Sequence, residues 1–560
     1  MRDLNILKEI DFSKIQISAQ SKAVDVALLN MVEDLIMENE KLTIQIQELK
    51  DEIDRLKGEK GRPIFRSNQE SDPKRREKGN KPRNKNHKKG GKRGTIKIDR
   101  EIVCKVDRMI LPPDAEFKGY EEHMQQDLEV KVVNTLYKLE IYYSRSNKRT
   151  YRANIAESGK GMYGSGVKGW LSLLNRFCDT TQSRLKELFA SLGISISTGT
   201  INNYLLEPQE WVLEEQNEIL KAGISSGSYG QIDGTKSVER GKSKATQIIC
   251  GELFTTFYTK PNKKRLSIIE ALLGIVEGQS VMKYGYNEVT KELLACSSVS
   301  LANRNTLEQI FGNKQEAGVF EWLGEKDAFE QRMQDLAPQI MSKKNMYERV
   351  VESFALGYYY SQDEFPVIDF LVSDDAPEYR KLSKVLHSLC WIHDARYYKK
   401  LVPRIERHRT ILTEVMDQYW RFYNLLLAYK GASKKEQKYQ YEIIKEEFDH
   451  IFSQKTQYFQ VNQCLERTLK NKEKLLAVLD NPALPLHNNA AELGARRIVR
   501  KRDISLHSWS AKGTIVRDAF MSVIQTCLKL GVSPFNYIMD RIKGEYAMPA
   551  LSSLIYQTNP

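Results

Sequence analysis

Apolar positions recur with a seven-residue period near the start of the chain. Leucines occupy every seventh position from 28 to 56, and the second seam position holds Val32, Asn39, Ile46 and Ile53. Leucine at one seam position, β-branched residues at the other and a single asparagine there are typical of a parallel two-stranded coiled coil. A lone helix packed on the body of the chain also shows an apolar stripe, but five leucines in register favour pairing. Residues 24–58 are therefore predicted to be a leucine zipper.

The hydrophobic period then changes twice. Apolar and polar residues alternate in short runs such as "LEVKVVNTLYKLEIYYS", which predicts a small β module over 95–155. From residue 164 the period is helical, and we expect helices near 166–178, 180–192 and 197–206. The last two are joined by "LGISIS", and the third opens with the capping residues of "STGTINNYL".

This arrangement predicts a helix-turn-helix within a helical region at 160–222. The second helix of such a motif enters the major groove of DNA, which makes its polar residues candidate base readers: Thr198, Thr200, Asn202 and Asn203. Short helix pairs joined through glycine also occur in proteins that never touch DNA, so the motif leaves both interpretations open.

Three acidic residues stand at the ends of predicted elements. Strands are expected near 228–233, 245–251 and 253–259, and Asp233 closes the first of them. Asp374 follows the buried strand in "FPVIDFLVSDDAPEY", and Glu492 lies in the first turn of the helix "NNAAELGARRIVRKR". Each has an ordinary interpretation: an aspartate forms turns, and Glu492 completes a capping box with Asn489.

Composition adds the charge. The 560 residues carry a formal net charge of +13, and 41 % of them are hydrophobic, which suits a soluble chain of three or four domains. No apolar run is long enough to span a bilayer, and no secretory signal is present. The seven cysteines form no C-x-x-C pair, so we expect a cytoplasmic protein without a disulfide framework.

Much of the positive charge lies in one segment. "KRREKGNKPRNKNHKKGGKR" at 74–93 holds eleven Lys or Arg and one acid, within a basic linker predicted at 59–94 and expected to be disordered. Such a run serves as a solvated linker or neutralises DNA phosphates. Its candidate DNA contacts are Lys74, Arg75, Arg76, Lys88 and Lys89.

Together the three acids suggest a different chemistry. Carboxylates gathered from two strand ends and a helix form an oxygen-rich pocket that suits two Mg²⁺ or Mn²⁺ ions. Two such ions clamp the attacking and leaving oxygens of a phosphoryl displacement. Glu492 therefore has a second candidate role, followed by Arg496, Arg497 and Arg500 on the same helix as candidate phosphate contacts.

Several ordered motifs resemble one family. "LGISISTGTINNYL", "QIDGT", "FLVSDDAPEY", "CWIHDAR", "LPLHNNAAELGAR" and "SVIQTCLKLGVSPFNYIMDRI" are similar, in this order, to segments of the large DDE transposases of bacterial insertion sequences, most closely the insertion-sequence sixty-six group. The resemblance covers about residues 160–545. It marks Cys390, Trp391, His393 and Arg396 as a structural signature.

The resemblance implies a multidomain α/β and α protein: coiled coil, small β module, helix-turn-helix and an RNase H-like mixed-sheet catalytic core. It implies that the core comprises 223–394 and 481–545, because the chain between the second and third acids is far longer than one strand and one helix require. A helical insertion is expected at 395–480. Asp233, Asp374 and Glu492 would be the metal ligands. The spacing of Asp374 to Tyr379 fits the family pattern, and Asp375 is the alternative to Asp374.

The sequence departs from the family pattern in two places. Family members often carry a cysteine-rich zinc module near 100–150, where this chain has only Cys104, and the position after the third acid holds Leu493 in place of the usual arginine. Cys390 and His393 are either half of a zinc site or structural, with His393 bonding within the core; the lack of a second pair favours the structural role. Trp391 is expected to pack in the core.

The function implied is that of a DNA transposase. It would bind terminal inverted repeats and target DNA as a homodimer or higher multimer, with two Mg²⁺ or Mn²⁺ ions. It would act in the bacterial cytoplasm at the nucleoid, without a membrane partner, with or without helper proteins. Two alternatives remain: a non-catalytic DNA-binding regulator, and an RNase H-like nuclease without strand transfer. Replacing Asp233 would distinguish the regulator from a transposase, because the regulator would keep its function and the transposase would lose strand cleavage.

Overall fold

The computed structural model describes residues 19–56, 98–106, 120–121, 123–128, 130–154, 161–207, 209–278, 280–312 and 319–558. The chain divides into two compact units, residues 1–36 with 132–560 and residues 37–131. The basic candidates Lys74, Arg75, Arg76, Lys88 and Lys89 lie outside the described residues. No helix in the described part of the chain is long and apolar enough to cross a membrane.

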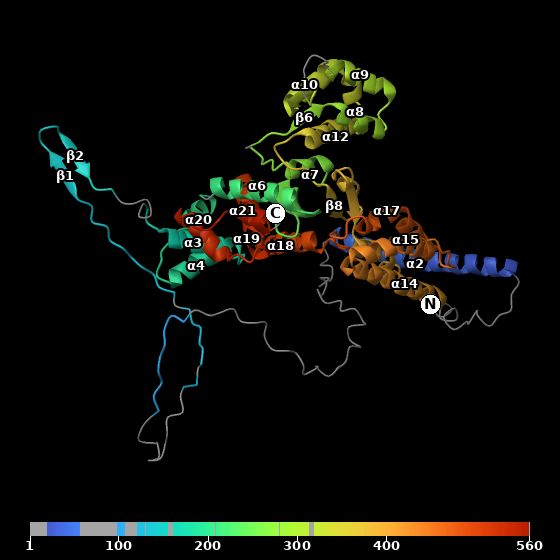
Figure 1. Cartoon of the computed structure of the whole chain (residues 1–560), viewed down its shortest axis with the longest axis horizontal. Coiled ribbons are helices and arrows are strands. Elements are labelled where there is room, and N and C mark those ends of the chain that lie inside the picture. Colours follow the sequence, from blue (N-terminus) through green and yellow to red (C-terminus); the bar gives the residue numbers. More distant parts are fainter. Residues whose placement is uncertain are drawn as a thin grey trace. The chain divides into compact units, whose positions relative to one another are not determined.

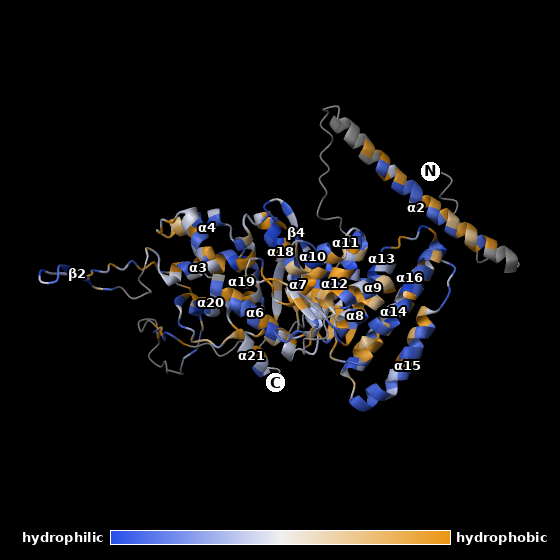
Figure 2. Cartoon of the chain, turned by 90° about the horizontal axis from the view of Figure 1, so that it is seen from above, coloured by the Kyte–Doolittle hydropathy of each residue, from blue (hydrophilic) through white to orange (hydrophobic). Residues whose placement is uncertain are grey.

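The predicted zipper lies on one uninterrupted helix, α2 (Ala19–Leu56), which contains neither Gly nor Pro (Figure 2). Its seam leucines at 28, 35, 42 and 49 are all at least half exposed, whereas Leu29 and Glu33 on the other side of the helix are buried. Glu33 accepts hydrogen bonds from the backbone amides of Arg404 and Ile405. The helix thus has a docked face and a free apolar face.

Strand structure is sparse in the predicted β module. Within the described residues of 98–154, strands occur only in the antiparallel hairpin of β1 (Ile141–Ser144) and β2 (Arg149–Arg152). Cys104 is exposed there. The described part of the module is therefore one hairpin, because the alternating residues before it have no partner strand and no core to cover them.

Three helices form the next small body, with bounds close to those expected. They are α3 (Ser165–Arg176), α4 (Gln182–Ser191) and α5 (Thr198–Leu206). Thr181 caps α4, and Ser197 caps α5 by accepting from the Thr200 amide. Gly193, with φ of 83°, makes the turn between them. Their shared core consists of Leu171, Leu185, Phe189, Ile196, Ile201 and Leu205.

The larger unit contains a mixed five-stranded sheet, of which Figure 1 labels strand β8. Helix α6 (Gln209–Ser226) leads into β3 (Gly230–Glu239), β4 (Lys242–Cys250) and β5 (Thr255–Lys260), which are antiparallel. Two strands parallel to β3 then complete the order β5-β4-β3-β8-β9: β8 (Phe370–Ser373) and β9 (Leu386–Leu389).

The segment between β5 and β8 has its own aromatic core. After α7 (Arg265–Leu272) come a second sheet of two strands and five helices: β6 (Lys283–Tyr286), α8 (Glu288–Cys296), α9 (Leu301–Phe311), β7 (Trp322–Glu325), α10 (Lys326–Leu336), α11 (Pro338–Met341) and α12 (Lys344–Ser361). Phe311, Phe329 and Phe354 pack against one another at their centre. The predicted core segment 223–394 thus contains more than the sheet.

Helices follow β9 over the predicted insertion. These are α13 (Trp391–Lys399), α14 (Glu406–Gly431), α15 (Lys434–Phe452), α16 (Phe459–Lys470), α17 (Lys472–Leu475) and the short η7 (Ala477–Leu479). The buried faces of α14 to α16 enclose Trp391, as predicted for that residue, with Tyr419, Phe422 and Phe448.

The chain then returns to the sheet. Helix α18 (Asn489–Ser505) packs on β3 and β4, and α19 (Ala511–Lys529) packs on β5 and α6. A Cβ at Gly494 would lie 2.8 Å from Cγ2 of Ile248, so this glycine lets α18 approach the sheet closely. The last helices are α20 (Pro534–Lys543) and α21 (Leu551–Thr558).

Candidate active site

Asp233 lies inside a long strand. Strand β3 continues to Glu239 before the tight turn at Arg240 and Gly241, both of positive φ, so the prediction that Asp233 closes its strand was wrong. The reason is Gly234, which resembled a turn residue but pairs with Gln247 across the β3–β4 ladder. The Asp233 side chain is half-buried, and its Oδ1 accepts the Gly234 amide at 2.7 Å.

Asp374 directly follows β8, as expected. Strands β3 and β8 run parallel, with Gln231 opposite Val372. Asp233 and Asp374 each lie two residues further along, so the register brings them to adjacent positions. The Asp374 carboxylate accepts the Ala376 amide at 3.0 Å, which fixes the turn after the strand.

The neighbouring Asp375 is engaged elsewhere. Its carboxylate pairs with Arg467 at 2.9 Å and with Arg380 at 3.4 Å. Asp374 instead interacts electrostatically with Asp233. These contacts favour Asp374 over Asp375 as the second acid.

Glu492 lies in the first turn of α18, but the predicted capping box does not form. The N-cap residue is Asn488, and its side chain makes no capping bond. The Asn488 amide group donates to the Ile232 carbonyl at 2.8 Å, and its backbone N–H donates to Cys390 Sγ. Tertiary contacts with β3 and α13 therefore replace the local cap and fix the start of α18 beside Asp233's strand.

The Glu492 carboxylate faces α13 instead of its own N-cap. Arg396 donates to both of its oxygens at 3.1 Å, and His393 Nε2 lies 3.6 Å from Oε1. Arg496, one turn along α18, lies 4.0 Å away. His393 thus contacts the third acid, where we had expected a bond within the core. Its Nδ1 has no hydrogen-bond partner in the part of the chain that the structure describes.

The other two acids influence the charge of Asp233. Burial raises the pKa of Asp233 to about 6, and the nearby Asp374 and Glu492 add to this rise, while the Gly234 amide and Lys263 oppose it. Burial also lowers the pKa of His393, with a further contribution from Arg396. The site therefore brings acidic groups near one another beside the C-terminal end of β8, with Asp233 in the interior of β3.

A ready-made metal cluster is not formed by these side chains. Among the described residues, no three His, Cys, Asp or Glu side chains are grouped closely enough to hold an ion. The same result applies to Cys390 and His393, the pair that would have formed half of a zinc site, and to the exposed Cys104. Cys390 is buried, and burial raises its pKa.

Two residues near the acids were missed or used only for spacing. Lys263 Nζ donates to the Gly234 carbonyl and lowers the pKa of Asp233. Tyr379 is buried, and its hydroxyl lies 3.3 Å from where a Cβ of Gly234 would be. The run "NKKRLS" around Lys263 gave no signal in the sequence, because the contact between Lys263 and Gly234 depends on how β5 pairs with β4.

The DNA-contact candidates occupy two surfaces. On α18, Arg496 and Arg500 are exposed on the face that carries Glu492, and Arg497 is half-buried. On α5, Thr198 and Asn202 are exposed. Thr200 is half-buried, and its hydroxyl bonds to Ser197.

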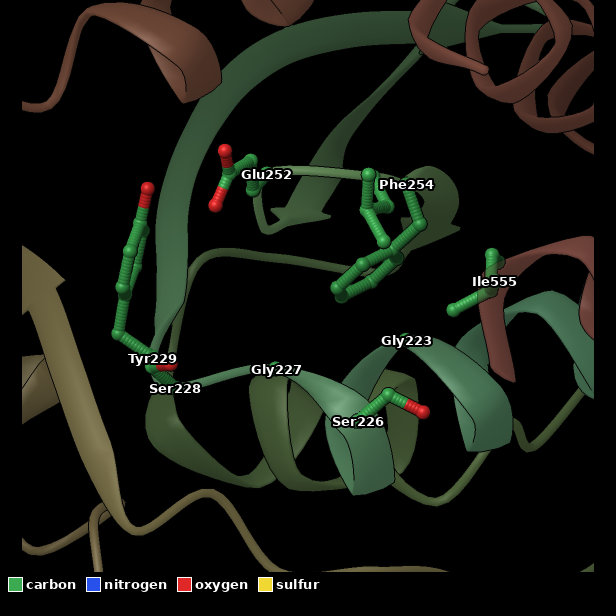
Figure 3. Close-up of a pocket in the computed structure, with 9 residues that line it drawn as sticks. Gly223, Ser226, Gly227, Ser228, Tyr229, Glu252, Phe254 and Ile555 are labelled. Atoms are coloured by element: carbon green, nitrogen blue, oxygen red, sulfur yellow. The ribbon is translucent and has the colours of Figure 1, made fainter. Parts of the chain in front are cut away.

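A small pocket lies at the start of β3, and none of the three acids lines it. Gly223 and Gly227 from the end of α6, with Tyr229, Phe254 and Ile555, form its walls (Figure 3). Glu252 is its one charged side chain. The pocket therefore offers no second acidic site.

Comparison with known proteins now bears on this arrangement. Residues 361–515 match the model of the transposase IS66 family. The resemblance inferred from the motifs is thereby confirmed over this segment. The matched segment includes Asp374, the Cys390–Arg396 signature and Glu492, whereas Asp233 precedes it.

A relative extends the similarity. An uncharacterized protein of Sinorhizobium fredii (strain NBRC 101917 / NGR234), y4jO, is 29 % identical over 330 residues, which cover 58 % of this chain and 94 % of the relative. No solved structure matches the chain.

Proposed function

We propose that this protein is a DDE-type DNA transposase that binds the terminal inverted repeats of its insertion sequence, cleaves the DNA at its ends and joins them to target DNA. One observation carries the proposal: Asp374 and Glu492, far from Asp233 in sequence, lie close enough to add to the rise that burial causes in the pKa of Asp233. Perturbed acids gathered on adjacent elements are a common feature of catalytic sites.

The sheet supports the proposed RNase H-like core. Three antiparallel strands followed by two parallel ones place the first acid on the central strand and the second at the end of its parallel neighbour. The helix that bears the third acid packs on that same central strand. The topology thus delivers the acids from three separate chain segments to one place.

The donor set fits a hard divalent cation. Carboxylate oxygens are the ligands that Mg²⁺ and Mn²⁺ prefer. Burial is the main cause of the raised pKa of Asp233, and a bound cation would relieve the smaller contribution that repulsion from Asp374 and Glu492 adds. Two such ions would supply Lewis-acid stabilisation of the phosphodiester oxygens. Glu492, now paired with Arg396, would have to exchange this partner to become a ligand.

The chain's own residues would bind and orient the DNA. Water attacks the phosphodiester at each end and releases a 3′-OH, which then attacks a target phosphodiester and displaces its 3′ oxygen. Arg496 and Arg500, on the face of α18 that carries Glu492, would hold the backbone phosphates near the acids. No Ser or Tyr nucleophile is required, because each step is a direct displacement.

End recognition is assigned to α5 and to the basic linker. The capped helix exposes Thr198 and Asn202, and asparagine pairs well with adenine in the major groove. The linker's Lys and Arg would add a sequence-independent, salt-sensitive contribution through phosphate contacts. The free apolar face of α2 suits pairing with a second copy, and such a complex would act in the cytoplasm at the nucleoid, with or without helper proteins.

The test is metal-dependent cleavage of DNA that carries the element's ends. Wild-type protein should nick this DNA with Mg²⁺ or Mn²⁺ and be inactive in EDTA. Asp233→Asn and Glu492→Gln should each reduce cleavage by at least about 1,000-fold while keeping DNA binding. The matched control is Asp503→Asn, an exposed acid on the same helix as Glu492, which should cleave normally.

The same assay separates the alternatives. Sequence-specific binding without cleavage by the wild type would favour a DNA-binding regulator. Cleavage without joining of the ends to a target plasmid would favour a nuclease. Unchanged cleavage by Glu492→Gln would remove Glu492 from the proposed site.

A further inference from the structure

Arg467 of the helical insertion contacts residues next to the site. It lies on α16, and its guanidinium bridges two carboxylates: Asp375 at 2.9 Å and Asp394 at 2.7 Å. Asp375 is the neighbour of Asp374, and Asp394 is on α13 between His393 and Arg396. One side chain therefore joins the turn after β8 to the helix that contacts Glu492.

The anchor for this bridge is deeply buried. Asp394 is 5 % exposed and also accepts hydrogen bonds from Thr468 at 2.7 Å and Tyr419 at 3.2 Å. Both donors are fully buried in the insertion. A buried carboxylate with three donors has little freedom to move, so it holds Arg467 in a fixed place.

The guanidinium is also fixed in orientation. Its Cζ atom lies 3.5 Å from the ring centroid of Tyr397, and its two terminal nitrogens donate to different carboxylates. Arginine suits this arrangement because its rigid fork can serve two acceptors while stacking on an aromatic ring. A lysine could reach one acceptor but could not reproduce the fork.

From this geometry we infer that Arg467 is a positioning residue for the second acid: the insertion holds the Asp374 turn in place through Asp375. The catalytic consequence of this inference rests on the proposed function, whereas its structural consequence does not. The inference gives the insertion a role beyond enlarging the fold. Among the described basic residues, the half-exposed Arg380 alone would still pair with Asp375 if Arg467 were removed.

The experiment compares Arg467→Gln with Arg467→Lys and Asp375→Asn. The matched control is Arg409→Gln, which removes an exposed arginine of the same insertion that pairs with Glu406. Two quantities are measured on the full chain: amide hydrogen exchange of residues 374–380 in the free protein, and cleavage of DNA carrying the element's ends. Exchange does not depend on catalysis, so it tests the structural step alone.

We expect Arg467→Gln to speed exchange at 374–380 and to lower the cleavage kcat by about 10- to 100-fold at an unchanged KM for DNA, because displaced ligands slow chemistry without weakening remote DNA contacts. Arg467→Lys should recover part of both losses. Asp375→Asn should speed exchange similarly, and adding it to Arg467→Gln should cause little further change. Arg409→Gln should match the wild type.

The outcomes are distinguishable. Unchanged exchange at 374–380 in Arg467→Gln overturns the inference, and so does faster exchange with unaltered kcat. If the wild type cleaves no DNA but Arg467→Gln still exchanges faster at 374–380, the positioning contact is supported and the proposed function is refuted. A global loss of stability would also overturn the inference. It would show as faster exchange throughout the chain in Arg467→Gln, with the same increase in Arg467→Lys and Asp375→Asn.

Discussion

At the scale of single residues, the two adjacent aspartates after β8 have different surroundings. Asp374 interacts with Asp233 and, among the described residues, accepts a hydrogen bond from the Ala376 amide, whereas Asp375 is held by Arg467 and Arg380. Of the two, Asp374 is therefore the carboxylate that acts on Asp233. The choice between them in sequence rested on spacing to Tyr379 alone.

This difference predicts unequal effects of the same substitution. Asp374→Asn should abolish metal-dependent cleavage, because it removes a proposed ligand oxygen. Asp375→Asn should lower cleavage by no more than about 100-fold, because it loosens the turn but leaves the ligands present. Single-turnover cleavage in Mg²⁺ measures both; greater damage from Asp375→Asn would reverse the assignment.

Residue-scale prediction from sequence failed where tertiary contacts competed with local ones. The capping box at Asn489 and Glu492 satisfied every local rule, yet the start of α18 is fixed by Asn488 bonding to β3, and Glu492 pairs with Arg396 from another helix. His393 was misplaced for the same reason. Neither partner is near in sequence, so the local pattern carried no information about them.

At the scale of elements, capping residues made prediction reliable. Helices α4 and α5 begin at the residues that Thr181 and Ser197 cap, within two positions of the expected starts. The three antiparallel strands were also foreseen. The long extent of β3 was not, because Gly234 resembles a turn residue until its pairing with β4 is known. The aromatic body between β5 and β8 gave no boundary signal.

One element-scale prediction concerns the pairing of β8 with β9. His387 of β9 is buried, and its Nε2 lies 2.7 Å from Ser373 Oγ. Burial lowers the pKa of His387 to about 4, with Lys474 and Arg380 contributing and Asp375 opposing. The unfolded chain therefore binds this proton more readily than the folded chain, and stability is lost as the pH falls from about 6.5 towards 4.

The size of this effect is roughly 2 to 4 kcal/mol when the shift is fully expressed. The midpoint of urea unfolding, measured at pH 7, 6 and 5, should fall less steeply in His387→Gln than in the wild type. His450→Gln, an exposed histidine on α15, should keep the wild-type slope. Parallel profiles for His387→Gln and the wild type would contradict a buried neutral imidazole.

At the scale of the whole molecule, helix α2 has two distinct faces. Leu29 and Glu33 are buried, and Glu33 bonds to the start of α14. The seam leucines lie on another face and remain exposed: Leu28 is 52 % exposed and Leu35 61 %. Docking within the chain therefore leaves the heptad seam available. A lone helix would gain nothing from exposing such a stripe to water.

The final prediction is that this seam holds two chains together. Leu35→Lys with Leu42→Lys should convert the dimer to a monomer, because each buried leucine contributes roughly 2 kcal/mol and charges are poorly tolerated in the seam. Light scattering coupled to size-exclusion chromatography measures the mass. Ile44→Lys, an equally exposed position outside the seam, is the control and should remain dimeric. A double variant that keeps the wild-type mass would show that the chains pair elsewhere, and a wild type that is monomeric at micromolar concentration would contradict the zipper itself.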